Sequence, residues 1–168
     1  MSTAAPRRIL VGVDYSSFAQ VALDRAIQLA ARDPETELHA LTVAEGDGPR
    51  LPPELVAGVK RDLEQEMKAS LGDYVLDRAQ HCDPKGLGDL RPRIHAHARI
   101  GFAADRLVQL ARELDAEIVV VGTHGRRGLR RLVVGSVAEE VVRRAGCPVL
   151  VVRERDHAAS AAPVDKAG

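Results

Sequence analysis

Aromatic side chains are nearly absent from this sequence. It contains no tryptophan, and phenylalanine and tyrosine together make up 2 % of its 168 residues. Proteins that bind single-stranded nucleic acid usually stack the bases on aromatic rings, so this kind of binding is disfavoured. Charge of one sign is also missing, because 24 basic residues balance 24 acidic ones. A neutral chain does not attract nucleic acid or an anionic membrane by bulk charge. We therefore expect neither as a partner.

Cysteine and long apolar runs are scarce as well. Two cysteines, Cys82 and Cys147, are too few for a disulfide scaffold, and neither has neighbours that indicate a redox function. No run approaches the roughly 18 apolar residues of a membrane span, and residues 1–8 lack the apolar segment of a secretory signal. These absences predict a soluble, cytoplasmic protein. We expect one domain over residues 7–153, a flexible start at 1–6 and a disordered tail at 154–168.

Apolar runs alternate with helical periodicity along most of the chain. Strands are predicted at residues 9–13, 38–43, 93–99, 118–121 and 149–152, with a helix in each interval. Right-handed crossovers between such units give a single α/β domain, a doubly wound parallel sheet with helices on both faces. Ligands bind such sheets beyond the carboxyl ends of the strands, where the strand order reverses. The residues directly after the first, second and fourth strands are therefore candidates for a site.

Local patterns predict how several of these segments begin and pack. Ser17 with Gln20, and Ser136 with Glu139, have the spacing of helix capping boxes. Residues 82–92 contain two prolines and two glycines and are expected to form a loop. The second helix is expected to carry an apolar side made of Val56, Val59, Leu63 and Met67, and the last helix to bury Ala138, Val141, Val142 and Ala145.

Asp14 and a glycine-rich segment stand at two of the candidate positions. A carboxylate at Asp14 can accept hydrogen bonds from a ribose or an adenine amino group, although an acid is also favoured simply near a helix start. Gly122 and Gly125 let the backbone approach a ligand closely. Gly135 and Ser136 open the fourth crossover helix, where free amide groups favour an anion. Together these residues predict a loop that closes over a triphosphate.

Other features of this segment leave alternatives open. The arginines at 126, 127, 130 and 131 can contact a phosphate or can be solvated surface residues. His124 is well placed for acid–base chemistry, but no nucleophile or acid pair accompanies it, so a hydrogen bond that stabilises the loop is the more economical role. Neither the Walker A pattern nor the Gly-x-Gly-x-x-Gly dinucleotide pattern occurs.

The spacing Gly-x2-Gly-x9-Gly-Ser, formed by Gly122, Gly125, Gly135 and Ser136, resembles the ATP-binding subset of the universal stress protein family. The stretch Val13-Asp14-Tyr15-Ser16 and the ending at residues 145–152 resemble the same family. The resemblance extends over about residues 7–153 and implies a Rossmann-like sheet of order 3-2-1-4-5.

The resemblance also implies a ligand and an assembly. The ligand is ATP, with Mg²⁺, acting in a stress-response sensor or signalling protein with unidentified protein partners. A weak ATPase or phosphotransferase, or a module for AMP or a cyclic nucleotide, remain alternatives. The implied site has Asp14 and the backbone of Val43 at the adenine and ribose, Gly122 at the ribose, and the phosphates against His124, Gly125, Arg127, Gly135, Ser136 and Val137. Members pair through the last strand, here Val149–Val152, so we expect a homodimer; pairing also covers an apolar edge.

The histidines suggest a second kind of site. His95 and His97 are two residues apart and face one side of a strand, and His39 can lie on the neighbouring strand. Two such histidines can bind zinc, but no third ligand has a suitable local spacing. We therefore expect structural or surface histidines and no metal.

Overall fold

The structure is a computed structural model that describes residues 6–46, 53–82, 87–123 and 135–153. Within these ranges the chain forms eleven elements. The strands are β1 (Arg7–Gly12), β2 (Thr36–Ala44), β3 (Ile94–Ile100), β4 (Ile118–Gly122) and β5 (Val149–Val152). The helices are α1 (Ser17–Ala30), α2 (Pro53–Cys82), α3 (Leu87–Leu90), a 3-10 turn at Arg91–Arg93, α4 (Ala103–Glu113) and α5 (Ser136–Arg144).

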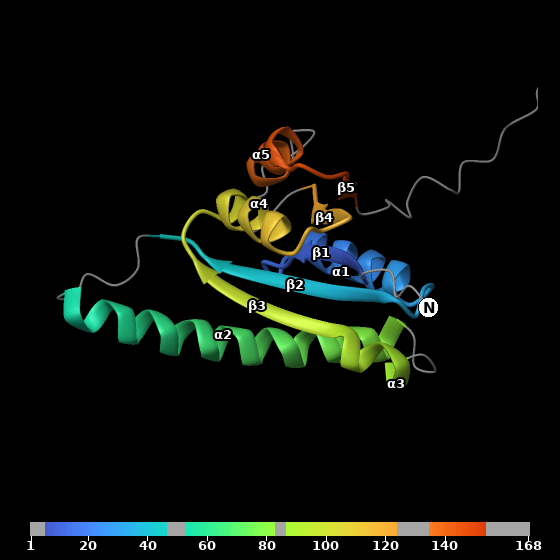
Figure 1. Ribbon diagram of the computed structural model, residues 1–168, viewed down its shortest axis with the longest axis horizontal. Coiled ribbons are helices and arrows are strands. Elements are labelled where there is room, and N and C mark those ends of the chain that lie inside the picture. Colours follow the sequence, from blue (N-terminus) through green and yellow to red (C-terminus); the bar gives the residue numbers. More distant parts are fainter. Residues whose placement is uncertain (1–5, 47–52, 83–86, 124–134, 154–168) are drawn as a thin grey trace, which may run out of the picture.

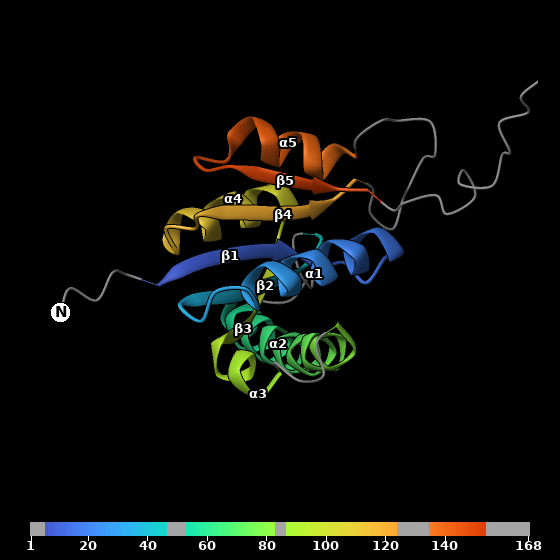
Figure 2. The ribbon, with the colours of Figure 1, turned by 90° about the vertical axis from the view of Figure 1, so that its right-hand side faces the viewer.

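The five strands form one parallel sheet of order β3-β2-β1-β4-β5. This confirms the predicted fold class and strand order. In Figure 2 the sheet rises from β3 to β5, and the arrowheads of β4 and β5 point to the same side. The strand order reverses between β1 and β4, so the carboxyl ends of these two strands form the switch point at which ligands bind in this class of fold.

Helices cover both faces of the sheet, which explains why the central strands β1 and β4 are nearly continuous apolar runs. α1 and the second half of α2 pack on one face, around Val11, Leu38 and Val120. α4 and α5 pack on the other, around Leu10 and Leu41. Figure 1 shows α4 and α5 on the opposite side of the strands from α2. Burying one large aliphatic side chain contributes about 1.5–3 kcal/mol, so these two clusters dominate the stability of the fold.

α1 and α5 begin at Ser17 and Ser136, but the residue that caps each helix lies one position before the one that the capping boxes predicted. Ser16, not Ser17, caps α1, because its Oγ accepts a hydrogen bond from the backbone N–H of Ala19 at 3.2 Å. Gly135, not Ser136, is the cap of α5, and as a glycine it has no side chain with which to bond to the first turn. On α5 the structure buries Ala138 and Val141 as predicted, but Val142 is exposed.

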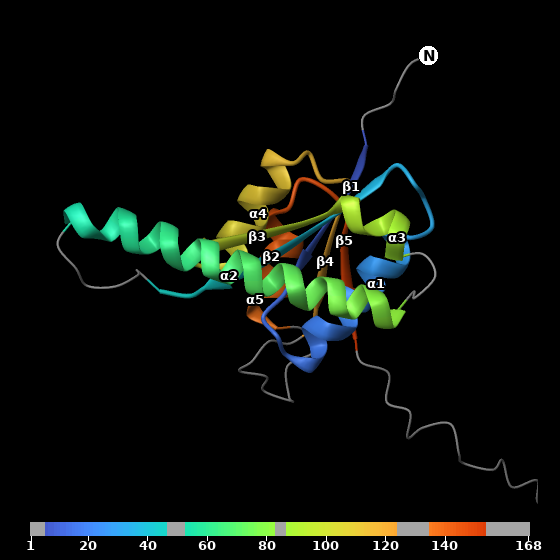
Figure 3. The same cartoon turned by 90° about the horizontal axis from the view of Figure 1, so that it is seen from below.

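α2 is longer than the sheet that it covers. Its buried residues, Leu71, Val75 and Ala79, all lie in the second half. The predicted apolar side lies in the first half, where Val59 and Leu63 are exposed. Figures 1 and 3 show why: the first turns of α2 project beyond the strands, so that no sheet lies beneath them.

Residues 87–93 are helical, whereas the sequence predicted a loop for 82–92. α3 buries Leu90 to 1 % exposure. The guanidinium of Arg93, at the end of the 3-10 turn, donates to the carbonyl oxygens of Ala30, Asp33 and Thr36. This connection therefore fastens the start of β3 to the end of α1. Among the described helices, none combines the length and the apolar character that crossing a bilayer requires.

Candidate functional site

Asp14 organises the turn between β1 and α1. The N–H of Val13 donates to the Leu41 carbonyl at 2.8 Å. The chain therefore stays paired with β2 for one residue beyond the end of β1. Asp14 Oδ1 then accepts hydrogen bonds from the backbone N–H of Ser16 at 3.0 Å and from its hydroxyl at 2.6 Å. Tyr15 between them has a positive φ of 63°. The carboxylate is thus held at the carboxyl end of β1, beside the amino end of a helix.

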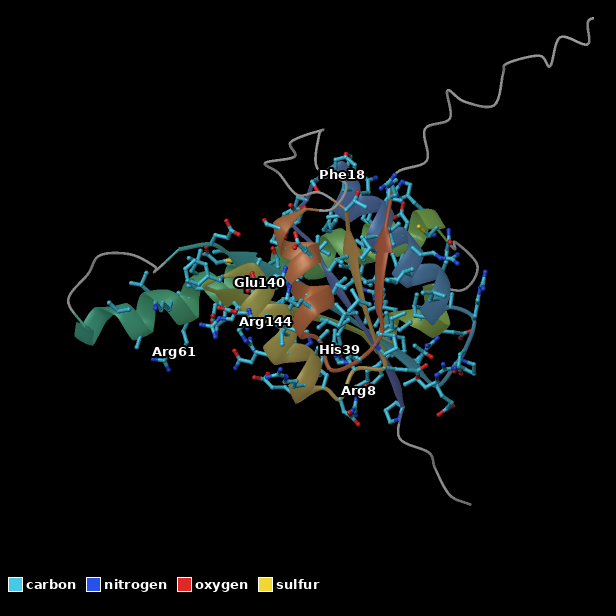
Figure 4. All side chains as sticks on the ribbon, turned by 90° about the horizontal axis from the view of Figure 1, so that it is seen from above. Arg8, Phe18, His39, Arg61, Glu140 and Arg144 are labelled. Atoms are coloured by element: carbon cyan, nitrogen blue, oxygen red, sulfur yellow. The ribbon has the colours of Figure 1, made fainter. Side chains whose placement is uncertain are left out.

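Gly122 ends β4 in direct contact with α1. A Cβ at this position would lie 2.8 Å from the backbone carbon and oxygen of Phe18. Ordinary contacts between carbon atoms are about 3.5–4.0 Å, so no other residue fits without a shift of the helix. Figure 4 shows Phe18 at the end of the molecule where the strands β4 and β5 finish. Close packing of α1 on β4 therefore requires this glycine whether or not a ribose lies against it.

Hydrogen bonds bring Gly135 back to the end of β4. Its backbone N–H donates to the carbonyl of Thr123, and the N–H of Thr123 donates to the carbonyl of Val152 at 3.0 Å. α5 starts at the next residue, Ser136, followed by Val137. The amide groups of a first helical turn have no partner within the helix, so they are available to an anion. Thr123 itself is 3 % exposed, and its hydroxyl has no hydrogen-bond partner within the described part of the chain.

The described candidates therefore share one edge of the sheet. Asp14, Gly122 and Gly135 lie at the carboxyl ends of β1 and β4, and Ser136 and Val137 form the first turn of α5 beside them. Val43 lies near the carboxyl end of β2, the strand next to β1, and is partly buried. The predictions for His124, Gly125 and Arg127, and for the neighbouring arginines 126, 130 and 131, lie outside the described residues.

A hollow of about 310 Å³ lies beside this edge, at the ends of β2 and β3. It is lined by Gly46, Lys60, Ile100, Gly101, Phe102, Asp105 and Arg106. None of the predicted site residues that the structure describes is among them. Sequence reasoning missed this group because its members come from α2, the end of β3, α4 and the segments that follow β2 and β3, and no local spacing links these parts.

The histidines predicted to be structural form a cluster with Glu37 in the sheet. The rings of His39 and His95 stack with centroids 4.7 Å apart, and His39 Nδ1 lies 3.0 Å from His97 Nε2. Burial lowers the pKa of His97 to about 4, with further lowering by His39 and Arg99. The pKa of His39 is also lowered, mainly by burial. His39 and His97 are therefore uncharged at neutral pH.

The family model for the universal stress protein family matches residues 6–153. A universal stress protein from Methanocaldococcus jannaschii is 30 % identical over 148 residues, covering 88 % of this chain and 82 % of the relative. The solved structure of UspA from Lactobacillus plantarum is 28 % identical, with a TM-score of 0.67 over 90 % of this chain and 100 % of that one. A solved universal stress protein in complex with cAMP is 27 % identical, with a TM-score of 0.63 over 89 % of this chain and 98 % of that one.

The match covers every described strand and helix, and the solved relatives agree with the order of the strands in the sheet. The chain belongs to the universal stress protein family.

Proposed function

We propose that the protein binds an adenine nucleotide, ATP with Mg²⁺ in the first instance, at the carboxyl ends of β1 and β4. The observation that carries this proposal is the convergence of Asp14, Gly122 and Gly135 on one edge, with the start of α5 beside them. A carboxylate for the nucleoside and free helix amides for the phosphates are the two kinds of group that a nucleotide needs. The related structure with cAMP bound supports an adenine ligand.

Each candidate residue has a role in this proposal. Asp14 and the backbone of Val43 hold the adenine and ribose, and Gly122 lies against the ribose. The phosphates lie at the amino end of α5, where Gly135, Ser136 and Val137 offer backbone amides and the dipole favours negative charge. From the sequence motif, His124, Gly125 and Arg127 complete the phosphate side.

The same hydrogen bonds connect the proposed site to a proposed dimer edge. β5 is one of the two outer strands of the sheet, and all four of its residues are partly exposed. The chain of bonds from Gly135 through Thr123 reaches Val152 on β5. A nucleotide that changes the position of the α5 start therefore acts on the strand through which we propose that two copies pair. Bound ATP would in this way shift the equilibrium between conformations of the dimer edge. Such a shift is a route by which ATP alters the binding of protein partners in a stress response.

Calorimetric titration of the full chain with ATP and Mg²⁺ tests the proposal, together with chromatography of the nucleotide after incubation. The variant Gly125→Val places a branched side chain in the glycine motif, and Gly146→Val is the matched control because a Cβ at Gly146 meets no atom within 4 Å. We expect wild type and Gly146→Val to bind one nucleotide per chain, and Gly125→Val to bind none.

Three outcomes would change the conclusion. Normal ATP binding by Gly125→Val would show that the assigned site is wrong. Tighter binding of AMP or cAMP than of ATP would identify the alternative nucleotide, for which the related cAMP complex is the specific precedent. Formation of ADP during incubation would indicate an enzyme in place of a binding protein.

A further inference from the structure

Four side chains with nitrogen or oxygen ligand atoms meet on one face of the sheet, on β2 and β3. His39 is paired in register with His95, and His97 follows two residues later on the same face. Glu37 precedes His39 by two residues and therefore shares that face as well. One ligand atom from each of Glu37, His39 and His95 lies within 4.8 Å of the other two.

We propose that Glu37, His39 and His95 bind a divalent transition-metal ion of the zinc type, independently of the nucleotide. A tetrahedral zinc ion with bonds of about 2.0–2.2 Å separates its ligand atoms by about 3.3 Å. His39 Nε2 lies 3.4 Å from Glu37 Oε2, and His95 Nε2 lies 4.0 Å from Glu37 Oε1. These two distances end on different oxygens of Glu37, and the rings of His39 and His95 are stacked. Binding of one ion by all three groups therefore requires His95 to rotate out of the stack, and the 41 % exposure of its side chain leaves room for that rotation.

Outer hydrogen bonds hold two of the three ligands in place. In the tautomer that metal binding requires, the Nδ1–H of His39 donates to His97 Nε2, 3.0 Å away, which leaves Nε2 as the lone-pair nitrogen. Glu37 Oε2 accepts a hydrogen bond from Arg8 Nε at 3.1 Å, which leaves Oε1 toward His95. Metal-ligating histidines and carboxylates are characteristically oriented by a second group in this way.

The exposure of the three proposed ligands increases toward one side of the cluster, and a metal ion can enter from that side. The side chains of His39, Glu37 and His95 are 7 %, 27 % and 41 % exposed, so the cluster opens to solvent on the His95 side. A fourth coordination position there is left for water. Two imidazoles and one carboxylate suit zinc and its neighbours in the first transition row, whereas calcium and magnesium prefer oxygen ligands alone.

The cluster is separate from the proposed nucleotide site. Glu37, His39 and His95 lie near the amino ends of β2 and β3, and the nucleotide residues lie at the carboxyl ends of the strands. In Figure 4, His39 and Arg8 are labelled toward the end of the sheet opposite to Phe18. The two proposals can therefore fail independently, and titrating each variant with both ZnCl₂ and ATP distinguishes the two failures.

The test uses the full chain without a purification tag, stripped with EDTA and titrated with ZnCl₂ by calorimetry. Co²⁺ then serves as a spectroscopic probe of a tetrahedral nitrogen and oxygen ligand set. His95→Ala removes the most exposed ligand, and Glu37→Gln keeps the side-chain volume while removing the charge. His81→Ala is the matched control, because His81 is an exposed histidine on α2 that contacts Asp77, outside the cluster.

We expect wild type and His81→Ala to bind one zinc ion per chain. Neither protein should bind Mg²⁺ at this site. His95→Ala and Glu37→Gln should each weaken zinc binding by about a hundredfold or more, since even loss of an outer-shell partner costs 10–100-fold. Circular dichroism melting of each metal-free variant verifies that it folds. Absence of zinc binding in wild type overturns the proposal. So does unchanged binding in both folded ligand variants, which would place the zinc elsewhere.

Discussion

Replacing Gly122 with alanine tests how closely α1 approaches β4. The added methyl group would lie 2.8 Å from two backbone atoms of Phe18 and 3.0 Å from its Cβ. Restoring an ordinary contact of about 3.5 Å requires a movement of about 0.7 Å between helix and strand. The helix cannot retreat freely, because Ala19 and Ala22 in the next turn are buried against the sheet.

Overpacking of this kind costs typically 1–3 kcal/mol, and backbone contacts at two atoms place Gly122→Ala in the middle of that range, at about 2 kcal/mol. For a domain of this size, 1 kcal/mol corresponds to roughly 2–4 °C, so the melting temperature should fall by about 4–8 °C. Urea denaturation followed by circular dichroism measures the free energy of unfolding directly.

Gly58→Ala is the matched control, because a Cβ at Gly58, in α2, meets no atom within 4 Å. The change there should stabilise the protein by about 0.5–1 kcal/mol, since alanine is the better helix former. The close-packing argument is refuted if Gly122→Ala is as stable as wild type, or if both alanine variants shift stability in the same direction.

Two further perturbations test the outer strand and a thiol. The carbonyls of Pro148, directly before β5, and of Val152, its last residue, accept hydrogen bonds from the N–H groups of Val119 in β4 and of Thr123 directly after β4. The alternation of a parallel ladder therefore directs the N–H of Val151 to the open edge. We expect Val151→Pro to convert the proposed homodimer to a monomer in light scattering, and Val151→Thr, which keeps the N–H, to leave it a dimer. Burial, followed by the nearby Asp24, raises the pKa of Cys82 from 9.0 to about 11. At pH 8 its alkylation in a Cys147→Ala background should therefore be about a hundredfold slower than that of an unperturbed thiol, since only the thiolate reacts.

Each of these expectations has a contrary result. A Val151→Pro dimer would exclude backbone pairing through β5 as the basis of assembly. Alkylation of Cys82 at the rate of free cysteine would show that its environment does not raise the pKa. The same pKa shift predicts that the fold loses stability as the pH rises above 9, because the unfolded thiol ionises first and releases its proton at lower pH than the folded one.

The strands and their order follow from patterns that are local in the sequence. Short apolar runs mark β1, β4 and β5, and alternation marks β3, whereas the reversal of order between β1 and β4 follows from the family resemblance carried by Gly122, Gly125 and Gly135. The starts of α1 and α5 agree with the sequence, but the capping residue was wrong by one position in each, because adjacent serines, or a glycine beside a serine, offer similar caps. Only the turn geometry at Asp14 selects Ser16 over Ser17.

Features that depend on contacts between distant elements could not be predicted. Exposure of Val59 and Leu63 depends on where the sheet beneath α2 ends, which no periodicity in that helix records. The third ligand of the histidine cluster, Glu37, becomes visible only once the register places His39 opposite His95. The packing role of Gly122 likewise requires knowing that α1 crosses the end of β4.

The two halves of α2 differ in burial, so the free energy needed to open the helix locally differs between its two halves. Leu71, Val75 and Ala79 anchor its second half in the core, so opening that half exposes buried apolar surface of the main cluster. The first half lacks such an anchor, since Val59 and Leu63 are exposed there. Local opening is cheapest where few apolar contacts are lost, so amide hydrogens in the first half should exchange with solvent well before those in the second. Evolution can therefore alter the projecting turns of α2 while the core that carries the sheet remains intact.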